Sequence, residues 1–252
     1  MKQKTAIITG ATSGIGLATA KILSENNYRL IITGRRLDRL ETLKEELEHD
    51  SCKVQTLCFD VRSKKEVDEA LASLEGEWRN VDVLVNNAGL AAGWNTIDEA
   101  DVDDWEAMID TNVKGLLYVT REISGWMKKQ GHGHIINISS VSGIDVYPNG
   151  SVYCGTKFAV NAISKTMRIE LAPYNIKVST ISPGAIETEF SLVRFKGNED
   201  RAAQIYEGFT PLNARDIAES IYFVLSRPAH VNINDILIMP IAQASGRDIF
   251  RK

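Results

Sequence analysis

A tyrosine and a lysine four residues apart, Tyr153 and Lys157, are the side chains in this sequence best suited to proton transfer. On a helix this spacing places both side chains on one face. A phenol with its ordinary pKa of about 10 is a poor base at neutral pH, and a neighbouring ammonium group lowers that pKa. The pair therefore predicts a general acid-base at Tyr153, assisted by Lys157. Alone, the same spacing is common on solvated helix faces, so it becomes specific only beside a cofactor site.

A glycine-rich segment near the N-terminus has the composition of a phosphate-binding turn. It follows a short β-branched run and precedes an Ala/Leu/Ile-periodic helix from Leu17, with the spacing G-x-x-x-G-x-G. Glycines permit a tight turn and a close approach of backbone amides to a pyrophosphate, and the helix N-terminus adds the positive end of its dipole. The residues predicted to form this dinucleotide-binding turn are Gly10, Thr12, Ser13, Gly14, Ile15 and Gly16.

The end of the second predicted strand indicates which dinucleotide binds. NAD enzymes usually place an acidic residue there for the ribose hydroxyl groups, whereas this chain has Gly34, Arg35 and Arg36. A guanidinium group suits a phosphate monoester. We therefore expect NADP, with Arg35 binding the 2′-phosphate and Arg36 or Ser13 assisting. The alternative is a solvated basic start of a helix, which the helix dipole disfavours.

Two further strand ends supply small or polar residues to the same edge of the sheet. Asp60 and Val61 follow the third strand, where a carboxylate is able to accept a hydrogen bond from the adenine amine. Asp60 would equally serve as the N-cap of the next helix. Asn87, Ala88 and Gly89 follow the fourth strand, where a dinucleotide crosses the sheet, and an ordinary Asn/Gly turn is the alternative interpretation.

Seven short β-branched runs alternate with helix-length segments along the chain. Apolar residues dominate each run instead of alternating with polar ones, as in a parallel sheet covered on both faces by helices. The predicted fold class is α/β, a single Rossmann-type, doubly wound domain over residues 1–252. The predicted strands are 5–9, 29–33, 54–60, 81–86, 134–139, 176–182 and 235–239. A long strand-free stretch contains a predicted substrate lid at about residues 185–212.

Composition and charge argue against several other classes of protein. The net charge is −4 with scattered basic residues, so no nucleic-acid partner is expected. The N-terminal segment has too few apolar residues for a signal peptide or a membrane span, which predicts a cytoplasmic protein with no membrane partner. Three cysteines without a C-x-x-C pair predict neither disulfides nor zinc, and His132 and His134 flank a glycine in a predicted surface turn, so no metal site is expected.

Four motifs in order and in register resemble those of short-chain dehydrogenases/reductases over nearly the whole chain. They are T-G-x-x-x-G-x-G, N-N-A-G, Y-x-x-x-K and the pair Pro183-Gly184. The resemblance implies an oxidoreductase in which Tyr153 exchanges a proton with the substrate oxygen, Ser140 hydrogen-bonds that oxygen, and Lys157 holds the nicotinamide ribose. It also implies that Asn112 supports a water-mediated proton relay to the lysine. Residues implied to contact the nicotinamide are Pro183, Gly184, Ile186 and Thr188.

The C-terminal part resembles a narrower group within that family. Many members end the last strand in Gly-Gly, whereas residues 235–243 read DILIMPIAQ. This ending, together with EFSLVRFKG at 189–197 and PAHVNIN at 228–234, is similar to NADP-dependent 3-hydroxy acid (serine, allo-threonine) dehydrogenases and to reductases of malonic semialdehyde and sulfoacetaldehyde. The resemblance implies a short carbonyl or alcohol substrate that carries an anionic group, and a homotetramer.

An arginine in the predicted lid is the candidate for binding that anionic group. Arg194 lies on the segment expected to close over the nicotinamide, and its forked donors suit a carboxylate or a sulfonate equally. An ordinary surface arginine is the alternative. Phe195 is expected to supply an apolar wall. The other predicted substrate-binding residues are Ser140, Tyr147, Asn149, Tyr153 and Gln243.

Two other functions stay open at this point. A reductase of neutral or apolar carbonyl compounds would use the same fold and the same acid-base pair. A nonenzymatic NADP sensor would keep the cofactor turn but lose the catalytic side chains, and the presence of Ser140, Tyr153 and Lys157 argues against it.

Overall fold

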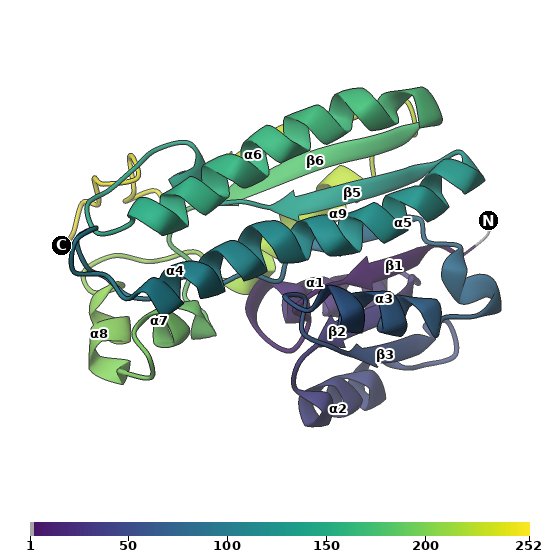
Figure 1. The fold of residues 1–252 in the computed structure, drawn as a ribbon, viewed down its shortest axis with the longest axis horizontal. Coiled ribbons are helices and arrows are strands. Elements are labelled where there is room, and N and C mark those ends of the chain that lie inside the picture. Colours follow the sequence, from purple (N-terminus) through teal and green to yellow (C-terminus); the bar gives the residue numbers. More distant parts are fainter. Residues whose placement is uncertain (1–2) are drawn as a thin grey trace.

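Seven parallel strands form the centre of the molecule, which a computed structural model describes from residue 3 to residue 252. They lie in the order β3-β2-β1-β4-β5-β6-β7, and every neighbouring pair is parallel (Figure 1). The strands are β1 (Thr5–Ile8), β2 (Arg29–Gly34), β3 (Val54–Cys58), β4 (Val83–Asn86), β5 (Gly133–Ile138), β6 (Ile176–Pro183) and β7 (Asp235–Ile238). The predicted α/β class and the seven-stranded parallel sheet are confirmed.

Helices cover both faces of this sheet. α1, α2 and α9 pack on one face, and α3, α5 and α6 pack on the other (Figure 1). The helices are α1 (Gly14–Glu25), α2 (Leu37–Leu47), α3 (Lys64–Ala72), α4 (Val102–Ile109), α5 (Leu116–Gln130), α6 (Ser151–Leu171), α7 (Glu189–Arg194), α8 (Glu199–Gln204) and α9 (Ala214–Leu225).

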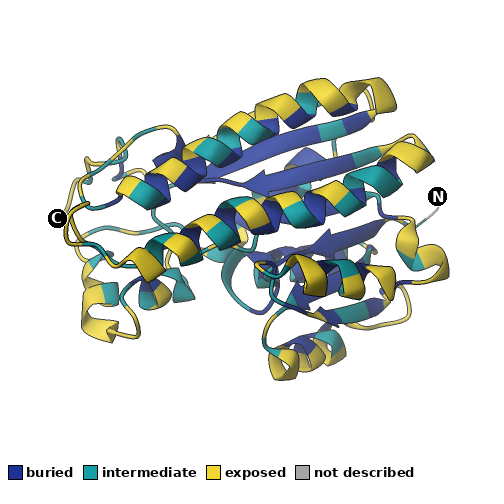
Figure 2. Cartoon of the chain, in the orientation of Figure 1, coloured by how far each residue is buried: buried dark blue, intermediate teal, exposed yellow. Residues whose placement is uncertain are grey.

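The strands are apolar on both faces because each face meets a helical layer. In β1, Ile7 points into the core under α3 and α5, whereas Ile8 points into the core under α1 and α9. Ile31 and Ile32 divide in the same way in β2, and all four side chains are fully buried. Figure 2 shows the corresponding pattern, with buried strands and helices exposed along their outer faces. This two-sided burial explains why the strands lack polar-apolar alternation.

Some element boundaries differ from those predicted. β3 ends at Cys58 instead of residue 60, and β4 begins at Val83 instead of residue 81. The first helix begins at Gly14 instead of Leu17, because the backbone N–H of Leu17 already donates to the Ser13 carbonyl at 3.2 Å. The glycine-rich turn and the first turn of the helix are therefore one continuous structure.

The strand order reverses beside β1, and this reversal places the functional cleft. β2 and β3 lie on one side of β1, whereas β4 to β7 lie on the other. The chain therefore leaves the carboxyl ends of β1 and β4 in opposite directions, which opens a crevice at that edge of the sheet. The segments that follow these strands form the rim of the crevice.

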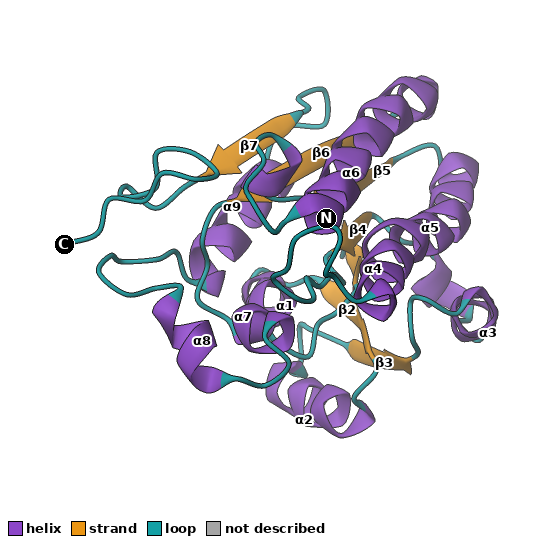
Figure 3. Cartoon of the chain, turned by 60° about the vertical axis from the view of Figure 1, so that its left-hand side comes forward, coloured by secondary structure: helices purple, strands orange, loops and turns teal. Residues whose placement is uncertain are grey.

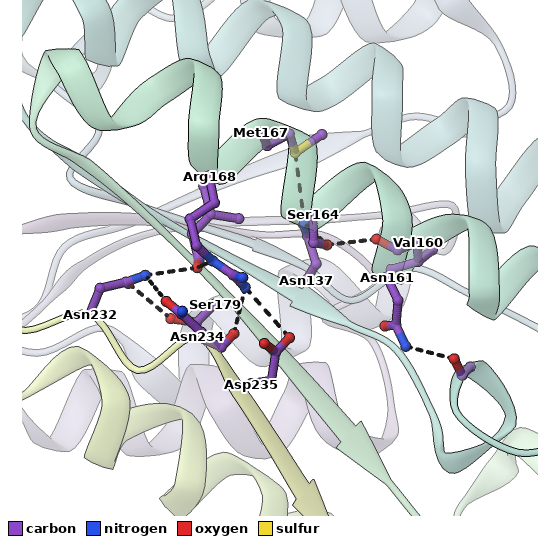
Figure 4. Close-up of polar contacts among 12 residues, drawn as sticks. Asn137, Val160, Asn161, Ser164, Met167, Arg168, Ser179, Asn232, Asn234 and Asp235 are labelled. Carbon is purple, nitrogen blue, oxygen red and sulfur yellow. Dashed lines mark hydrogen bonds and ion pairs between the residues drawn. The ribbon is translucent and has the colours of Figure 1, made fainter.

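Polar side chains attach the edge strand β7 to the rest of the sheet (Figure 4). Arg168 on α6 donates to the carbonyls of Val178 at 3.1 Å and Asn234 at 2.8 Å. The Asn232 amide also donates to the Val178 carbonyl, at 3.2 Å. These bonds fix the residues just before β7 on β6, and so fix the start of the last strand.

The described residues also bear on the expectations for a membrane span, a metal site and disulfides. Between residues 3 and 252, no helix is long and apolar enough to cross a membrane. Within the same residues, no cluster of three or more His, Cys, Asp or Glu side chains is arranged to hold a metal ion. Cys52, Cys58 and Cys154 are free thiols, of which only Cys58 is exposed.

Candidate active site

A cleft of about 330 Å³ lies at the carboxyl ends of the parallel strands. All residues predicted to bind the cofactor line it except Gly16. These lining residues are Gly10, Thr12, Ser13, Gly14, Ile15, Arg35, Arg36, Asp60, Val61, Asn87, Ala88, Gly89, Tyr153, Lys157, Pro183, Gly184, Ile186 and Thr188. Residues far apart in the sequence thus meet at one edge of the sheet.

Gly16 contributes to the cleft through packing. A Cβ atom at this position would lie 2.4 Å from the Gly10 carbonyl oxygen and 2.5 Å from the Asn87 side chain. Gly10 and Gly14 have positive φ angles of 66° and 53°, which glycine adopts without strain. The turn therefore fits a pyrophosphate group, since it brings backbone close to the cleft beside the N-terminus of α1.

Two arginines line the cleft in different ways. Arg36 donates through Nε and Nη2 to the Thr12 hydroxyl, at 3.2 and 2.8 Å, and through Nη2 to the Ser13 hydroxyl at 3.2 Å. Arg35 has a side chain that is 60% exposed, and it lies 3.7 Å from the Asp60 carboxylate. Arg36 is thus held in place by the turn, whereas Arg35 is loosely held and able to reorient.

Asp60 lines the cleft, but its carboxylate is bound by a neighbour. Arg62 donates to it from Nε at 2.9 Å and from Nη2 at 2.6 Å. Although burial alone would raise the pKa of Asp60, the hydrogen bonds from Arg62 lower it. The N-cap of α3 is Ser63, so the alternative role of Asp60 as helix cap is wrong.

Asn112 lies in a short π-helical segment, Asp110–Gly115, between α4 and α5. Its side-chain oxygen accepts from the Leu90 N–H at 2.9 Å, and its amide donates to the Leu90 carbonyl at 2.8 Å and to the Thr156 hydroxyl at 3.0 Å. Such π segments often mark functional sites in helices. Asn112 thereby links the segment after β4 to α6, the helix that carries Tyr153.

Tyr153, Lys157 and Ser140 meet in the buried part of the cleft. Tyr153 and Lys157 are separated by one turn of α6, and the Lys157 ammonium lies 5.8 Å from the centre of the Tyr153 ring. Lys157 donates to the Ile138 carbonyl at 3.0 Å. Ser140 lies two residues after β5, and its hydroxyl accepts from the Ser142 N–H at 3.1 Å. Ser140 faces the tyrosine, whereas the Ser139 hydroxyl donates back to the Lys157 carbonyl at 3.3 Å.

The predicted lowering of the tyrosine pKa by Lys157 does not occur in this arrangement. Burial raises the pKa of Tyr153 above its ordinary value, and a hydrogen bond with Ser140 and the charge of Arg194 oppose this only in part. Burial also lowers the pKa of Lys157 to about 8. The reason is that desolvation dominates for both groups, while the ammonium is directed at the Ile138 carbonyl. Burial therefore favours the protonated form of the Tyr153 phenol.

Arg194 is buried against aromatic rings. Arg194 is only 9% exposed. Its guanidinium carbon lies 4.2 Å from the centre of the Trp94 ring, 5.4 Å from that of the Tyr147 ring and 5.7 Å from that of the Tyr153 ring. Its Nε donates to the Gly93 carbonyl at 3.4 Å. Within residues 3–252 no carboxylate forms an ion pair with it, although acidic side chains bind the neighbouring Lys196. A buried cation of this kind is suited to binding an anion.

Comparison with known proteins agrees with this geometry. Residues 4–198 match the family described as short chain dehydrogenase. The chain belongs to this family. It is 46% identical over 239 residues to the NADP-dependent 3-hydroxy acid dehydrogenase YdfG of Salmonella typhi, covering 94% of this chain and 95% of that protein. It is 41% identical over 249 residues to the serine 3-dehydrogenase of Agrobacterium fabrum, covering 98% of each.

A solved structure similar to this short-chain dehydrogenase is that of the closed form of serine dehydrogenase complexed with NADP+. The TM-score is 0.92 with 43% sequence identity, and the match covers 98% of this chain and 100% of that chain. The predicted membership of the short-chain dehydrogenase/reductase family is confirmed, as is the resemblance to 3-hydroxy acid and serine dehydrogenases.

The remaining predicted substrate residues occupy different places in the dehydrogenase. Tyr147 stacks on Trp94 with ring centres 5.4 Å apart, and Asn149 lines a small second cavity beside Tyr153 and Arg194. The Gln243 side chain does not line the main cleft, because its oxygen accepts from the Ala185 N–H at 2.7 Å. Gln243 therefore supports the backbone after Gly184 instead of facing a substrate.

The apolar wall expected from Phe195 has another origin. Phe195 follows α7 and packs against Trp94, with ring centres 6.3 Å apart. α7 instead contributes Phe190 and Val193 to the lining of the cleft, and the Phe190 ring lies 5.6 Å from the Tyr153 ring. The helical periodicity of α7 accounts for the difference, since Phe190 and Val193 lie three residues apart on the side that faces the cleft.

Trp94, Glu189 and Phe190 are among the residues of the site that the sequence reasoning missed. Trp94 lies in a loop after β4 and carries the Arg194 guanidinium on its ring. Glu189 and Phe190 line the cleft directly after Thr188, the last residue of the predicted nicotinamide segment. Their position beside that segment is the signal that would have found Glu189 and Phe190, whereas no local pattern marks Trp94.

Proposed function

We propose that this short-chain dehydrogenase uses NADP to interconvert a short anionic aldehyde or ketone and its alcohol, of the 3-hydroxy acid or serine type or the sulfoacetaldehyde type. The observation that carries the substrate class is Arg194, a buried guanidinium group without an acidic partner in the described chain, 5.7 Å from the Tyr153 ring. The names of its relatives, which include a 3-hydroxy acid and a serine dehydrogenase, support the same class.

The residues present fit NADP. The turn from Gly10 to Gly16 would hold the pyrophosphate, and Arg35 and Arg36 would bind the 2′-phosphate. Lys157 would bind the nicotinamide ribose, with Pro183, Gly184, Ile186 and Thr188 around the nicotinamide. When bound, the reduced cofactor supplies the hydride for carbonyl reduction.

The acid-base step follows from the burial of Tyr153. In reduction, the phenol donates its proton to the carbonyl oxygen as negative charge develops there, and the Ser140 hydroxyl donates a hydrogen bond to the same oxygen. In oxidation, the deprotonated tyrosine accepts the proton of the alcohol. Asn112 holds the Leu90 segment against α6, where a water-mediated path would return a proton toward Lys157.

The anionic group of the substrate would bind Arg194. The guanidinium group has a planar face on Trp94 and two edges that carry N–H donors, of which Nε is directed at Gly93. The Arg194 side chain also hydrogen-bonds the Tyr147 hydroxyl, and the remaining Nη donors would bind a carboxylate or a sulfonate. With its anionic end fixed in this way, a short substrate would present its reacting carbon near Tyr153 and Ser140.

Residues 185–212 would act as a lid over the substrate. α7 and α8 lie at the carboxyl-terminal edge of the sheet (Figure 3), and the base of the segment is closed where Ile186 pairs with Leu212. A related serine dehydrogenase has been described in a closed form with NADP+. We propose that closure over the substrate excludes water from the reacting groups.

A homotetramer is also proposed. α4 and α5 follow one another along one line, and α6 lies beside them on the same face of the molecule (Figure 1). Large apolar residues are exposed along the three helices. These are Val102, Ile109, Leu117, Phe158 and Ile169. Burial of such residues between copies of the chain would stabilise an assembly. Light scattering behind size exclusion should give the mass of four chains, and a monomer mass would contradict the assembly.

The proposed activity is tested by initial rates with NADPH and a panel of small aldehydes. Malonic semialdehyde and sulfoacetaldehyde represent the two anionic classes, and neutral aldehydes of the same length serve as controls. Serine and 3-hydroxy acids are tested with NADP+ in the reverse direction. We expect kcat/KM to be highest for an anionic substrate. Higher values for neutral or apolar carbonyl compounds would favour the alternative reductase function.

A further inference from the structure

A carboxylate lies among the arginines at the adenosine end of the cleft. It belongs to Glu189, the first residue of α7, which lines the cleft. Its Oε2 atom lies 3.0 Å from Nη1 of Arg36, and its Oε1 atom lies 2.7 Å from Nη1 of Arg39. Each carboxylate oxygen is therefore bound to a different guanidinium group.

The hydrogen bonds of Arg36 leave little room for another acceptor. A guanidinium group has five N–H donors. In Arg36, Nε and Nη2 are directed at the hydroxyls of Thr12 and Ser13, and Nη1 is directed at Glu189. A phosphate that needs the Nη1 side of Arg36 therefore competes with the Glu189 carboxylate.

Charge makes this competition unfavourable for simultaneous binding. The hydrogen bond from Arg39, followed by that from Arg36, lowers the pKa of Glu189, so its carboxylate is ionised at neutral pH. A phosphate monoester carries a charge of about −1.5 to −2 at that pH. The two anions repel each other when both lie beside one guanidinium group, even though water screens part of the effect.

Glu189 is itself part of the proposed lid, as the first residue of α7. Glu189 follows Thr188, whose hydroxyl accepts from the Phe190 N–H at 3.3 Å and so caps α7. Phe190 and Arg194 on this helix lie against Tyr153. The bond between Glu189 and Arg36 thus joins the 2′-phosphate end of the cleft to the helix that shapes the substrate end.

Separate ion pairs and a backbone hydrogen bond hold the C-terminal end of α7. Lys196 lies 3.0 Å from the Asp104 carboxylate and 3.3 Å from the Asp101 carboxylate at the start of α4. The Gly93 N–H also donates to the Arg194 carbonyl at 3.0 Å. A change at Glu189 would therefore move the beginning of α7 while its end stays fixed.

We propose that Glu189 is a cofactor-specificity residue that couples recognition of the 2′-phosphate to the position of α7. Its carboxylate and the 2′-phosphate exchange on Arg36, so binding of the phosphate frees Oε2 and leaves the first turn of α7 held only by the contact of Oε1 with Arg39. A ligand without the 2′-phosphate leaves the bond between Glu189 and Arg36 in place. This inference rests on the proposed use of NADP.

Calorimetric titration with adenosine 2′,5′-bisphosphate and with 5′-AMP tests the exchange, because the two ligands differ only in the 2′-phosphate. Glu189→Gln keeps the side-chain size and removes the charge. We expect this variant to bind the bisphosphate about two- to fivefold more tightly than the wild type, with 5′-AMP affinity unchanged. The matched control is Asp38→Asn, an exposed carboxylate on α2 that does not line the cleft, which should leave both affinities unchanged.

Hydrogen exchange of the α7 amides provides the second readout. In the wild type the bisphosphate should raise exchange over residues 189–194 relative to 5′-AMP, and in Glu189→Gln the two ligands should give equal exchange. Three results would overturn the role of Glu189. The Glu189→Gln variant could bind the bisphosphate more weakly than the wild type, it could bind both ligands more tightly by the same factor, or Asp38→Asn could also bind the bisphosphate more tightly. A wild type that binds both ligands equally would instead contradict the proposed use of NADP, and the role of Glu189 with it.

Discussion

The cofactor end and the substrate end of the cleft are built in different ways. The cofactor end consists of short segments that follow β1 to β4, and the parallel register of the sheet fixes where each of them lies. The substrate end joins three segments that share no strand: the loop with Trp94, the turn with Tyr147 and the helix with Arg194. A site at strand ends is determined by the fold, whereas a site between loops is determined by side-chain contacts.

The two ends also differ in what holds them together. Backbone hydrogen bonds fix the cofactor turn, for example from the Ala11 N–H to the Thr33 carbonyl at 2.9 Å. Stacking of Arg194 on Trp94 and half-exposed ion pairs such as Lys196 with Asp101 fix the substrate end. Such exposed ion pairs contribute little to stability. The substrate end should therefore move and vary more easily than the cofactor end.

The largest expected effect is at the residue that both ends share. Tyr153→Phe removes the proton donor and keeps the ring, so turnover should fall by about 10²- to 10⁴-fold while NADPH affinity stays nearly constant. Steady-state rates and fluorescence titration of NADPH measure the two quantities. Tyr174→Phe, which changes an exposed tyrosine at the end of α6, is the control. If Tyr153→Phe retained most of its turnover, Tyr153 would not be the acid-base.

The next effect separates the two ends directly. Arg194→Ala should lower kcat/KM for an anionic aldehyde by about 2 to 4 kcal/mol, or roughly 30- to 1000-fold, and change it little for a neutral aldehyde. NADPH affinity should not change, because Arg194 does not line the cofactor cleft. Trp94→Phe, which keeps an aromatic ring under the guanidinium group, should have a smaller effect. An equal loss on both aldehydes would mean that Arg194 only supports the lid.

A smaller effect concerns the cofactor end alone. NADPH should bind tighter than NADH by about 1.5 to 3 kcal/mol, or roughly tenfold or more, because the 2′-phosphate gains a charge-assisted hydrogen bond from an arginine. Arg35→Gln and Arg36→Gln should each reduce this preference, whereas Arg215→Gln on α9 should not. Fluorescence titration with both reduced cofactors measures the preference. Tighter binding of NADH by the wild type would sink the assignment of NADP.

The smallest expected effect is on stability. The pKa of Lys157 is lowered to about 8 in the folded protein, so the unfolded chain binds more protons than the folded chain between pH 8 and its ordinary pKa of 10.5. Burial of the lysine therefore costs stability below pH 8, and the cost disappears as the pH rises through that range. Lys157→Met should raise the free energy of unfolding by about 1 kcal/mol at pH 7 while abolishing turnover.

Urea denaturation at pH 7 and at pH 9.5 measures this difference, with Lys165→Met on the exposed side of α6 as the control. The gain for Lys157→Met should be smaller at the higher pH. A destabilised Lys157→Met variant at pH 7 would show that the hydrogen bond to the Ile138 carbonyl outweighs the cost of burial.

The sequence was sufficient to predict the sheet and most of the residues that line the cleft, because these residues follow from local sequence signals. Apart from Tyr153 and Lys157 on α6, the residues predicted to bind the cofactor follow strand ends closely, so the position of the strand gives the position of the residue. The contacts of Gln243 and Trp94 could not be predicted in this way. Gln243 is 58 residues from its partner Ala185, and Trp94 meets Arg194 through contacts between a loop and a lid. A hydrogen bond between residues far apart in the sequence leaves no periodic pattern in it, and neither does the stacking of a side chain from one loop on another.

The pKa of Tyr153 could not be predicted either. The spacing of Tyr153 and Lys157 correctly places them on one face of α6, but it does not give the depth of burial or the Ile138 carbonyl that binds the ammonium. Desolvation is a property of the assembled cleft, and here its sign is opposite to that of the expected charge effect.

The central position of β1 has a consequence for synthesis on the ribosome. β2 and β3, which lie on one side of β1, are complete once residue 58 has been made, but the neighbour on its other side ends at Asn86. At a translation rate of about 5 to 20 residues per second, roughly one to six seconds separate the two events. During that interval the nascent chain presents the open edge of a buried apolar strand, which is the part of the molecule most prone to pair with another chain.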